Sequence, residues 1–249
     1  MDLHGTVAIV TGGNGGLGQC ICHALARAGS HIAVVYAQSR EQAQGVVDEL
    51  RQTGVRAEAL QCDVTHPQQV DQLVTRVVET FGRVDILVND AAYNKWIPFR
   101  DLDAMTYEEW TKILDVNLTG PMLCIKAVAP VMQRQGGGRI VNISSVAGLT
   151  PSGSSIPYAV SKAGLIHLTR CMAVGLAPDI LVNCIAPGYL EGTRATSNLD
   201  PAYQEQAKAG SLLKRAADKD DIADQVVALC RTNSITGQTL GIDAGRFFH

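Results

Sequence analysis

Short apolar runs alternate with helix-like stretches along the whole chain, and this alternation restricts the fold more than any other feature. The runs lie at residues 6–11, 31–36, 57–64, 84–90, 139–145, 180–188 and 238–243, and the helix-like stretches at 16–28, 39–53, 67–80, 106–134, 157–177 and 219–231. Nearly continuous apolar strands are typical of a parallel sheet that is buried on both faces. Because parallel strands joined through helices form right-handed βαβ units, the sequence predicts an α/β fold. We expect a doubly wound parallel sheet of about seven strands with helices on both faces.

No linker-like segment interrupts this pattern, so we expect one domain that covers residues 1–249. Apolar residues make up 46% of the chain and charged residues 18%, as in a folded rather than a disordered protein. The most polar insertion lies at residues 197–210. This segment is consistent with a mobile lid over a site, and also with a pair of solvated helices.

Composition argues against several kinds of partner. The formal net charge of −3 gives no broad positive field, so we expect neither nucleic acid nor an anionic membrane as a partner. The chain has no uninterrupted apolar run of membrane-spanning length, and its first residues lack the basic start of a signal peptide. Its seven cysteines are scattered, and Cys20 and Cys22 are too close in sequence to share a helix face. We therefore expect reduced thiols in a cytoplasmic protein, and no metal site.

A glycine-rich loop, TGGNGGLG at residues 11–18, connects the first apolar run to the first helix. Read as G-x-G-x-x-G, it contains Gly13, Gly15 and Gly18; read as T-G-x-x-x-G-x-G, it contains Thr11, Gly12, Gly16 and Gly18. In either case glycine lets the backbone approach a pyrophosphate, and the N-terminus of the following helix offers N–H groups to it. The loop therefore predicts a bound dinucleotide.

The end of the second strand indicates which dinucleotide is bound. An NAD site places an Asp or Glu there, to bind the 2′-hydroxyl of the ribose. This chain instead has Tyr36, Ser39 and Arg40, and no carboxylate before Glu41. Hydroxyl groups and a guanidinium suit a 2′-phosphate better, so NADP(H) is favoured over NAD(H). The alternative is that Arg40 is only a solvated residue at a helix start.

Tyr158 and Lys162 are four residues apart at the start of a helix-like stretch, which places both side chains on one helix face. A nearby ammonium group stabilises a phenolate, so we expect Lys162 to lower the pKa of Tyr158. Ser145 ends the strand-like run 139–145, where its hydroxyl can bind a substrate oxygen together with Tyr158. A Tyr-x-x-x-Lys pair alone is common, but with the glycine loop and this serine it predicts proton-transfer chemistry beside a cofactor.

These motifs together resemble the short-chain dehydrogenase/reductase family, in particular its single-domain branch, which includes 3-oxoacyl-thioester reductases and alcohol and sugar dehydrogenases. The resemblance covers essentially the whole chain and implies a Rossmann-like fold. It also favours the reading of the loop with Thr11, Gly12, Gly16 and Gly18.

The resemblance implies specific site residues. The implied catalytic residues are Asn117, Ser145, Tyr158 and Lys162. The expected cofactor contacts are Gly12, Asn14, Gly15, Gly16, Leu17, Gly18, Tyr36, Ser39, Arg40, Asp63, Val64, Asn89, Ala91, Tyr158, Lys162, Pro187, Gly188 and Thr193. The chain departs from the family pattern at Asp90 and Ala92, within a stretch that reads Asn-Asn-Ala-Gly in the family. It also has one extra residue before Thr193.

The implied activity is NADP(H)-dependent interconversion of a carbonyl and a secondary alcohol. Tyr158 would act as acid/base, Lys162 would also hold the nicotinamide ribose, Ser145 would position the carbonyl, and Asn117 would anchor a water molecule. Two alternatives stay open. One is an NAD(H)-dependent alcohol or sugar dehydrogenase of the same family, and the other is a non-catalytic dinucleotide-sensing protein.

Substrate and assembly are less constrained. We expect a small ketone or alcohol in a pocket lined by Tyr93, Asn94, Lys95, Trp96, Ser152, Gly153, Tyr189 and Leu190. Among these, Lys95 is either a contact for an anionic substrate or a solvated lysine.

The family implies a homotetramer, with a dimer as the alternative, that uses the helices at 106–134 and 157–177 and the C-terminal region. The tail, residues 246–249, ends in exposed aromatic residues and is expected to contribute.

Overall fold

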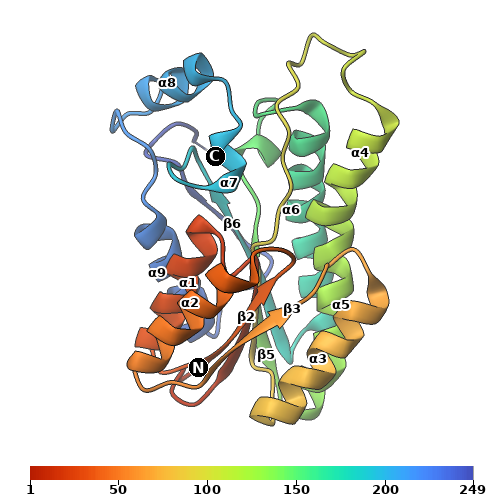
Figure 1. Ribbon diagram of the computed structural model, residues 1–249, viewed down its shortest axis with the longest axis vertical. Coiled ribbons are helices and arrows are strands. Elements are labelled where there is room, and N and C mark those ends of the chain that lie inside the picture. The colour runs from red at the N-terminus through yellow and green to blue at the C-terminus, as the bar shows by residue number, and fades with distance from the viewer. Residues whose placement is uncertain (249) are drawn as a thin grey trace.

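The computed structural model describes residues 1–248, and the predicted sheet is present in them (Figure 1). Seven strands, all parallel, form one sheet in the order β3-β2-β1-β4-β5-β6-β7. The strands are β1 (Val7–Thr11), β2 (His31–Tyr36), β3 (Ala57–Gln61), β4 (Ile86–Asn89), β5 (Gly138–Ile143), β6 (Ile180–Pro187) and β7 (Thr239–Ile242). The predicted Rossmann-like doubly wound fold is therefore confirmed.

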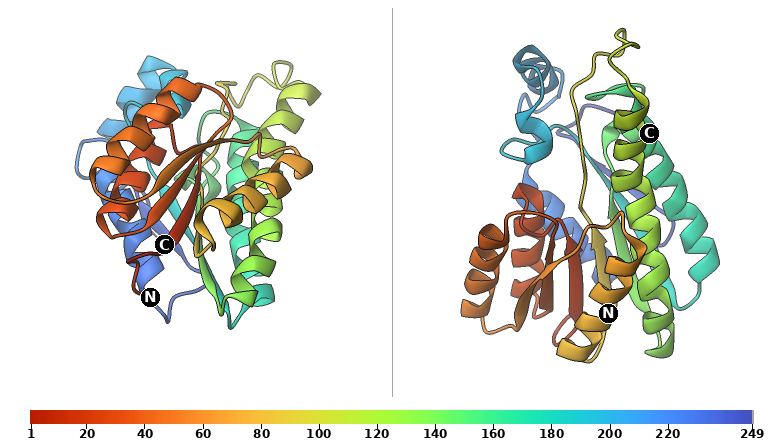
Figure 2. Two further views of the ribbon diagram at one scale, coloured as in Figure 1. Left: turned by 60° about the horizontal axis from the view of Figure 1, so that its bottom comes forward. Right: turned by 45° about the vertical axis from the view of Figure 1, so that its right-hand side comes forward.

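Helices cover both faces of this sheet (Figures 1 and 2). On one face lie α1 (Gly16–Arg27), α2 (Arg40–Gln52) and α9 (Lys219–Arg231), and on the other α3 (Pro67–Phe81), α4 (Tyr107–Leu114), α5 (Gly120–Arg134) and α6 (Ile156–Leu176). Successive residues of a strand face opposite sides. In β1, Ala8 and Val10 join the apolar cluster under the first set of helices, whereas Val7 and Ile9 join the cluster under the second. Burial on both faces explains why the apolar runs do not alternate with polar residues.

The strand order reverses direction at β1. The chain proceeds from β1 to β2 and β3 on one side, and then crosses to β4 on the other side. Thr11 and Asn89, the last residues of β1 and β4, are paired across this point. A crevice outside the carboxyl ends of the strands at such a switch is where open α/β sheets bind ligands.

The helix expected at residues 106–134 is present as one helical stretch, Tyr107–Arg134, with a π-helical turn inside it. This turn, Asp115–Thr119, separates α4 from α5, and it carries the fully buried Asn117. Pro121 follows in the first turn of α5, a position where the missing N–H of proline does no harm. The π-helical turn brings Asn117 under the loop that follows β4.

Two short helices, α7 (Arg194–Ser197) and α8 (Pro201–Ala209), occupy the polar segment after β6. They lie beyond the carboxyl end of the sheet, across from the loop that follows β4 (Figure 2). The segment expected to be either a lid or a helix pair is therefore helical. Whether it moves stays a prediction.

Among the described residues, Tyr107–Arg134 is the one helical stretch whose length and mean hydropathy of 1.2 are compatible with crossing a membrane. Its α5 part packs against β4, β5 and α3. The buried side chains of Ile125, Val128 and Met132 belong to the apolar cluster there. Helices in the core of a folded domain can have the same length and mean hydropathy as a membrane-spanning helix.

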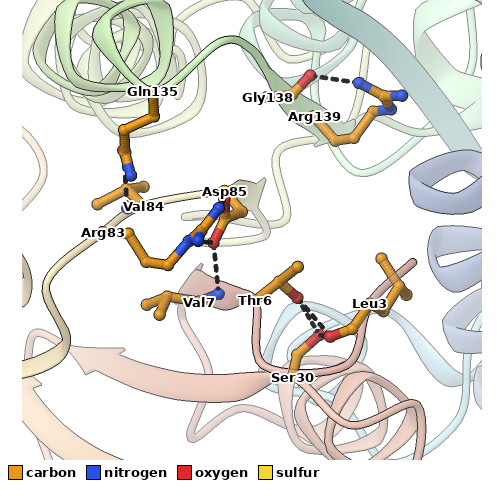
Figure 3. A network of polar contacts seen from close by, with 10 residues as sticks. All are labelled: Leu3, Thr6, Val7, Ser30, Arg83, Val84, Asp85, Gln135, Gly138 and Arg139. Atoms are coloured by element: carbon orange, nitrogen blue, oxygen red, sulfur yellow. Dashed lines mark hydrogen bonds and ion pairs between the residues drawn. The ribbon is translucent and has the colours of Figure 1, made fainter. Parts of the chain in front are cut away.

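A polar network joins neighbouring strands at their amino ends, away from the crevice at the carboxyl ends (Figure 3). The carboxylate of Asp85 is buried and accepts hydrogen bonds from the backbone N–H of Val7 at 2.9 Å and from two nitrogens of Arg83 at 2.7 Å each. The hydroxyl groups of Thr6 and Ser30 are 2.8 Å apart. These contacts join the starts of the neighbouring strands far from the crevice.

Candidate active site

The glycine loop has the shape that a pyrophosphate requires. Gly12 has a φ of +68°, and a Cβ atom on it would lie 3.0 Å from the backbone of Ala91. A Cβ atom on Gly18 would clash with the carbonyl oxygen of Gly12. Gly15 precedes α1, which begins at Gly16 and has neither a side-chain cap nor an acidic residue in its first turn. The N–H groups at this helix start are therefore available to an anion, as a dinucleotide needs.

The adenosine side of the crevice lies where β2 ends. Tyr36 is 5% exposed, and its ring packs in the apolar core, so it presents little hydroxyl surface. Ser39 follows with a φ of +64°, and Arg40 begins α2; both side chains are exposed. The amide of Asn14 donates to the carbonyl oxygen of Gln38 at 3.0 Å, which holds the glycine loop against this turn.

Arg194, which sequence analysis did not identify, also reaches this turn. It is the first residue of α7, and its guanidinium donates to Ser39 Oγ at 3.1 Å and to Gln42 Oε1 at 2.9 Å. The hydrogen bond to Ser39 joins residues that are 155 positions apart, so no local sequence pattern predicts it. It gives the end of β2 a second guanidinium beside Arg40.

The remaining nucleotide-side residues surround the switch point. The hydroxyl of Thr11 accepts the N–H groups of Asp90 and Ala91, both at 3.1 Å, which fixes the turn after β4. Asn89 donates to Asn142 Oδ1 at 2.8 Å, and its own Oδ1 is buried without a protein partner among the described residues. Farther out, Asp63 accepts from Thr65 at 2.7 Å, next to the buried Val64.

The segment after β6 borders the other side of the crevice. Pro187 ends β6, and the N–H of Gly188 donates to the carbonyl oxygen of Ile242 at 2.8 Å. Thr193 caps α7, and its hydroxyl accepts the N–H of Thr196 at 3.2 Å. Thr193 lies close to Gly16, because a Cβ atom on that glycine would be 3.4 Å from its Cα. The backbone here therefore lies against the start of α1.

Ser145 and Tyr158 meet at one small cavity of about 70 Å³. Ser145 follows β5, and its Oγ accepts the N–H of Ala147 at 3.2 Å, which fixes the hydroxyl at the strand end. Tyr158 lies in the first turn of α6. Lys162 lies one turn later and is 3% exposed; its Nζ donates to the carbonyl oxygen of Ile143 at 2.9 Å and lies 5.7 Å from the centre of the Tyr158 ring. The structure thus brings the predicted serine, tyrosine and lysine together.

Burial dominates the ionisation of this cluster. It raises the pKa of Tyr158 to about 12, although an interaction with the Ser145 hydroxyl opposes the rise. Burial also lowers the pKa of Lys162 to about 8, against the opposing influence of the Asp90 charge. The pKa of Tyr158 is therefore raised rather than lowered as expected, because loss of water around the buried phenol is the largest influence on it. At neutral pH Tyr158 is a protonated phenol, which is the form that can donate a proton.

Asn117 lies behind this cluster rather than in the cavity. Its Oδ1 accepts the N–H of Tyr93 at 2.8 Å, and its Nδ2 donates to the carbonyl oxygen of Tyr93 at 3.0 Å and to Ser161 Oγ at 3.1 Å. The side chain thus ties the loop after β4 to α6. Both of its N–H donors are used within the protein.

Several of the residues predicted for the substrate pocket do line the cavity: Asn94, Ser152, Gly153 and Tyr189. Others do not. Lys95 forms an ion pair with Glu109 at 2.7 Å, and Leu190 is buried in the core. Trp96 contacts Tyr203, with 5.2 Å between the ring centres, and so supports a lining residue.

The distal wall of the cavity includes two residues, Leu199 and Tyr203, of the segment 197–210 that was considered as a lid, and three residues that were not predicted for the pocket. It comes from α7, α8, their connection and the C-terminal tail, and consists of Ala195, Thr196, Leu199, Tyr203 and Arg246. In the sequence these residues come after β6 or after β7. Folding places them over the carboxyl ends of the strands. Among residues 1–248, no group of three or more His, Cys, Asp or Glu side chains is arranged to hold a metal ion.

Comparison with known proteins agrees with this geometry. Residues 6–204 match the family model for short chain dehydrogenases. The chain is 38% identical over 241 residues to a candidate ketoacyl reductase of the granaticin polyketide synthase of Streptomyces violaceoruber, covering 96% of this chain and 95% of that protein. It is 37% identical over 243 residues to a 3-oxoacyl-(acyl-carrier-protein) reductase of Staphylococcus epidermidis, covering 96% and 98%.

A solved structure gives the same result. A candidate short-chain alcohol dehydrogenase from Sinorhizobium meliloti superposes with a TM-score of 0.91 at 33% identity, covering 98% of this chain and 97% of the other. A switch-point glycine loop, a Ser-Tyr-Lys cluster and relatives along nearly the whole chain thus agree. The chain belongs to the short-chain dehydrogenase/reductase family and is an NAD(P)-dependent oxidoreductase.

Proposed function

We propose that the protein is an NADP(H)-dependent reductase that interconverts a carbonyl and a secondary alcohol, with residues 1–249 acting as one cofactor-binding catalytic domain. The observation that carries this proposal is the cavity that both Ser145 and Tyr158 line, with the Lys162 ammonium 5.7 Å from the centre of the Tyr158 ring. These are the groups needed to bind and protonate a carbonyl oxygen.

The glycine loop and the start of α1 would hold the pyrophosphate, and Lys162 the nicotinamide ribose. The remaining contacts would come from Asn14, Ser39, Arg40, Asp63, Val64, Asn89, Ala91, Pro187, Gly188 and Thr193, with Tyr36 supporting the adenosine side. A bound nicotinamide supplies the hydride for the carbonyl carbon.

In this proposal the chain itself handles the oxygen and the proton. Ser145 donates a hydrogen bond to the substrate oxygen and fixes its direction. Tyr158 gives its phenolic proton to that oxygen, and its raised pKa keeps the proton in place until the oxygen becomes basic. Charged Lys162 then stabilises the phenolate. Asn117 acts as a positioning residue because it holds the loop after β4 against α6.

NADP(H) is favoured because positive charge collects where the 2′-phosphate would lie. The turn after β2 contains no carboxylate before Glu41, Arg40 follows Ser39 in the sequence, and the Arg194 guanidinium donates to the Ser39 hydroxyl. A 2′-phosphate accepts hydrogen bonds from such groups, whereas the free hydroxyl of NAD gains little from them.

The names of the relatives favour a ketone on an acyl chain as the substrate, since two of them are ketoacyl or 3-oxoacyl reductases. The name of the S. meliloti protein favours instead an alcohol dehydrogenase, which would run the same chemistry toward the ketone. The second candidate is therefore an NAD(H)-dependent alcohol or sugar dehydrogenase of the same family. A non-catalytic dinucleotide sensor is the third candidate, and the complete Ser-Tyr-Lys cluster argues against it.

We also propose a cytoplasmic homotetramer, with a dimer as the alternative. Helix α6 leaves Val160 43% and Val174 84% exposed, and Phe248 in the tail is 79% exposed. A symmetric interface would bury this surface on both partners at once. Two residues expected to need such a cover do not, because Ala159 and Ile166 are buried within the chain. His249, the end of the tail, lies outside the described residues.

The proposal is tested by giving the purified protein NADPH and a panel of small ketones while NADPH absorbance is followed. Tyr158→Phe should lower turnover by about 100-fold or more while thermal shift shows that NADPH still binds. Tyr107→Phe, at a tyrosine that is 76% exposed, is the matched control and should leave turnover unchanged. Wild-type turnover in Tyr158→Phe would rule out the mechanism, and binding without consumption of NADPH would identify a sensor.

A further inference from the structure

We infer that Arg246, at the C-terminal tail, is a substrate-binding residue that selects ketones carrying a carboxylate group. The inference rests on the proposed carbonyl reduction and names the class of substrate for the same cavity. No family motif and no local sequence pattern indicated this arginine.

The position of Arg246 is built into the fold. Asp243 follows β7, and its carboxylate accepts the backbone N–H groups of Gly245, Arg246 and Phe247 at 3.0, 3.1 and 2.8 Å. The carbonyl oxygen of Gly245 accepts the N–H of Leu212 at 3.2 Å, which holds the tail to the segment after α8. The tail is thereby folded back over the carboxyl edge of the sheet, and Arg246 reaches the cavity wall.

Within the described part of the chain, no ion pair neutralises the guanidinium of Arg246. Arg246 is also the only charged side chain among the residues that line the cavity. Asp243, the acidic residue closest in sequence, is occupied by three backbone N–H groups. A guanidinium placed beside a small cavity without a protein carboxylate can bind a carboxylate from a ligand through two parallel hydrogen bonds.

The surroundings favour such a pairing. The guanidinium lies 5.4 Å from the centre of the Phe247 ring, which supports its flat face. Tyr203 lies near enough for the Arg246 charge to oppose the rise in its pKa that burial causes. Lys95, the lysine that sequence analysis considered for an anionic substrate, is neutralised by Glu109 instead. Arg246 is therefore the cation among the residues that line the cavity together with Ser145 and Tyr158.

The size of the cavity restricts the rest of the substrate. A volume of about 70 Å³ has room for about five water molecules. This suits a short oxo acid, whose carboxylate would bind Arg246 while its ketone meets Ser145 and Tyr158.

The inference is tested with pairs of ketones that differ only in charge. Reduction of 3-oxobutanoate and 4-oxopentanoate is compared with reduction of their methyl esters, using NADPH and the full-length protein. Wild type should show a kcat/KM for at least one acid about 10- to 100-fold above that for its ester. Arg246→Gln should reduce this ratio toward one, while Arg246→Lys should keep part of the ratio. Arg134→Gln removes an exposed arginine at the far end of α5 and should leave the ratio unchanged.

Binding without turnover provides a second measurement. Butanoate should raise the melting temperature of the NADPH-loaded protein more than butanamide does, and Arg246→Gln should abolish the difference. Equal reduction of acids and esters by wild type, or an acid preference that survives in Arg246→Gln, overturns the inference and leaves carbonyl reduction standing. If no ketone is reduced, the proposed function fails, and the butanoate comparison alone decides whether Arg246 binds carboxylates.

Discussion

Arg194 offers the most direct test of cofactor choice, because it reaches the end of β2 from a distant part of the chain. Its guanidinium donates to Ser39 Oγ and Gln42 Oε1, and neither partner is charged. Replacing it with glutamine removes the positive charge and keeps a side chain that can still bond to Gln42. If Arg194 contacts the 2′-phosphate of NADPH, the substitution should lower kcat/KM for NADPH and leave kcat/KM for NADH unchanged.

The size of the effect follows from the exposure of the site. A hydrogen bond to a charged group contributes about 1.5–3 kcal/mol, but Arg194 is exposed, and solvent screening reduces this. We therefore expect a loss of about 1–2 kcal/mol, which lowers kcat/KM for NADPH about 5- to 30-fold. Arg40→Gln should cause a similar loss, and the double variant should lose most of the preference for NADPH.

The assay is the ratio of kcat/KM for NADPH to kcat/KM for NADH, measured with one ketone at a fixed salt concentration. Arg134→Gln, an exposed arginine at the opposite edge of the sheet, is the control and should leave the ratio unchanged. An equal loss for both cofactors in Arg194→Gln would show that the residue only fastens α7 to α2. A wild-type preference for NADH would refute the argument from the end of β2.

Four further outcomes are expected. Because burial lowers the pKa of Lys162 to about 8, reductive kcat/KM should fall as the pH rises above about 8. Asp90→Asn should move this fall to lower pH, since the Asp90 charge raises the lysine pKa; an unmoved pH profile would contradict the coupling. Asp85→Asn should lower the free energy of unfolding in urea by about 1–3 kcal/mol and leave kcat unchanged, because the residue binds Val7 and Arg83 far from the cavity; lost activity at full stability would refute this. Val174→Glu should reduce the assembly seen by light scattering, and a wild-type monomer of 26.5 kDa at micromolar concentration would refute the proposed interface.

The parts of the site that lie within single elements were predictable from the sequence. Tyr158 and Lys162 share one face of α6 because residues four apart on a helix are neighbours. Gly12 and Gly18 were predicted from the glycine-rich motif between a strand and a helix, and Ser145 because it ends a strand-like run. The structure adds that Gly18 is restricted by the neighbouring Gly12, whereas Gly12 is restricted by the distant backbone of Ala91.

The ionisation of the cluster was not predictable in the same way. The sequence places an ammonium near a phenol, which predicts a lowered tyrosine pKa, but it does not show how much water either group loses on folding. In the structure burial is the largest influence on both Tyr158 and Lys162, and it reverses the expected direction for the tyrosine.

The sequence by itself determined the fold class, since apolar runs without alternation require a sheet covered on both faces, and it determined the local motifs on that sheet. Only the tertiary structure decided which distant residues meet at the carboxyl edge. Arg194 reaches Ser39 across 155 positions, and the tail brings Arg246 back to the Tyr158 cavity. The physical reason is that the strand order and the packing of α7, α8 and the tail fix these contacts. Such packing depends on the summed burial of the whole chain rather than on any local pattern.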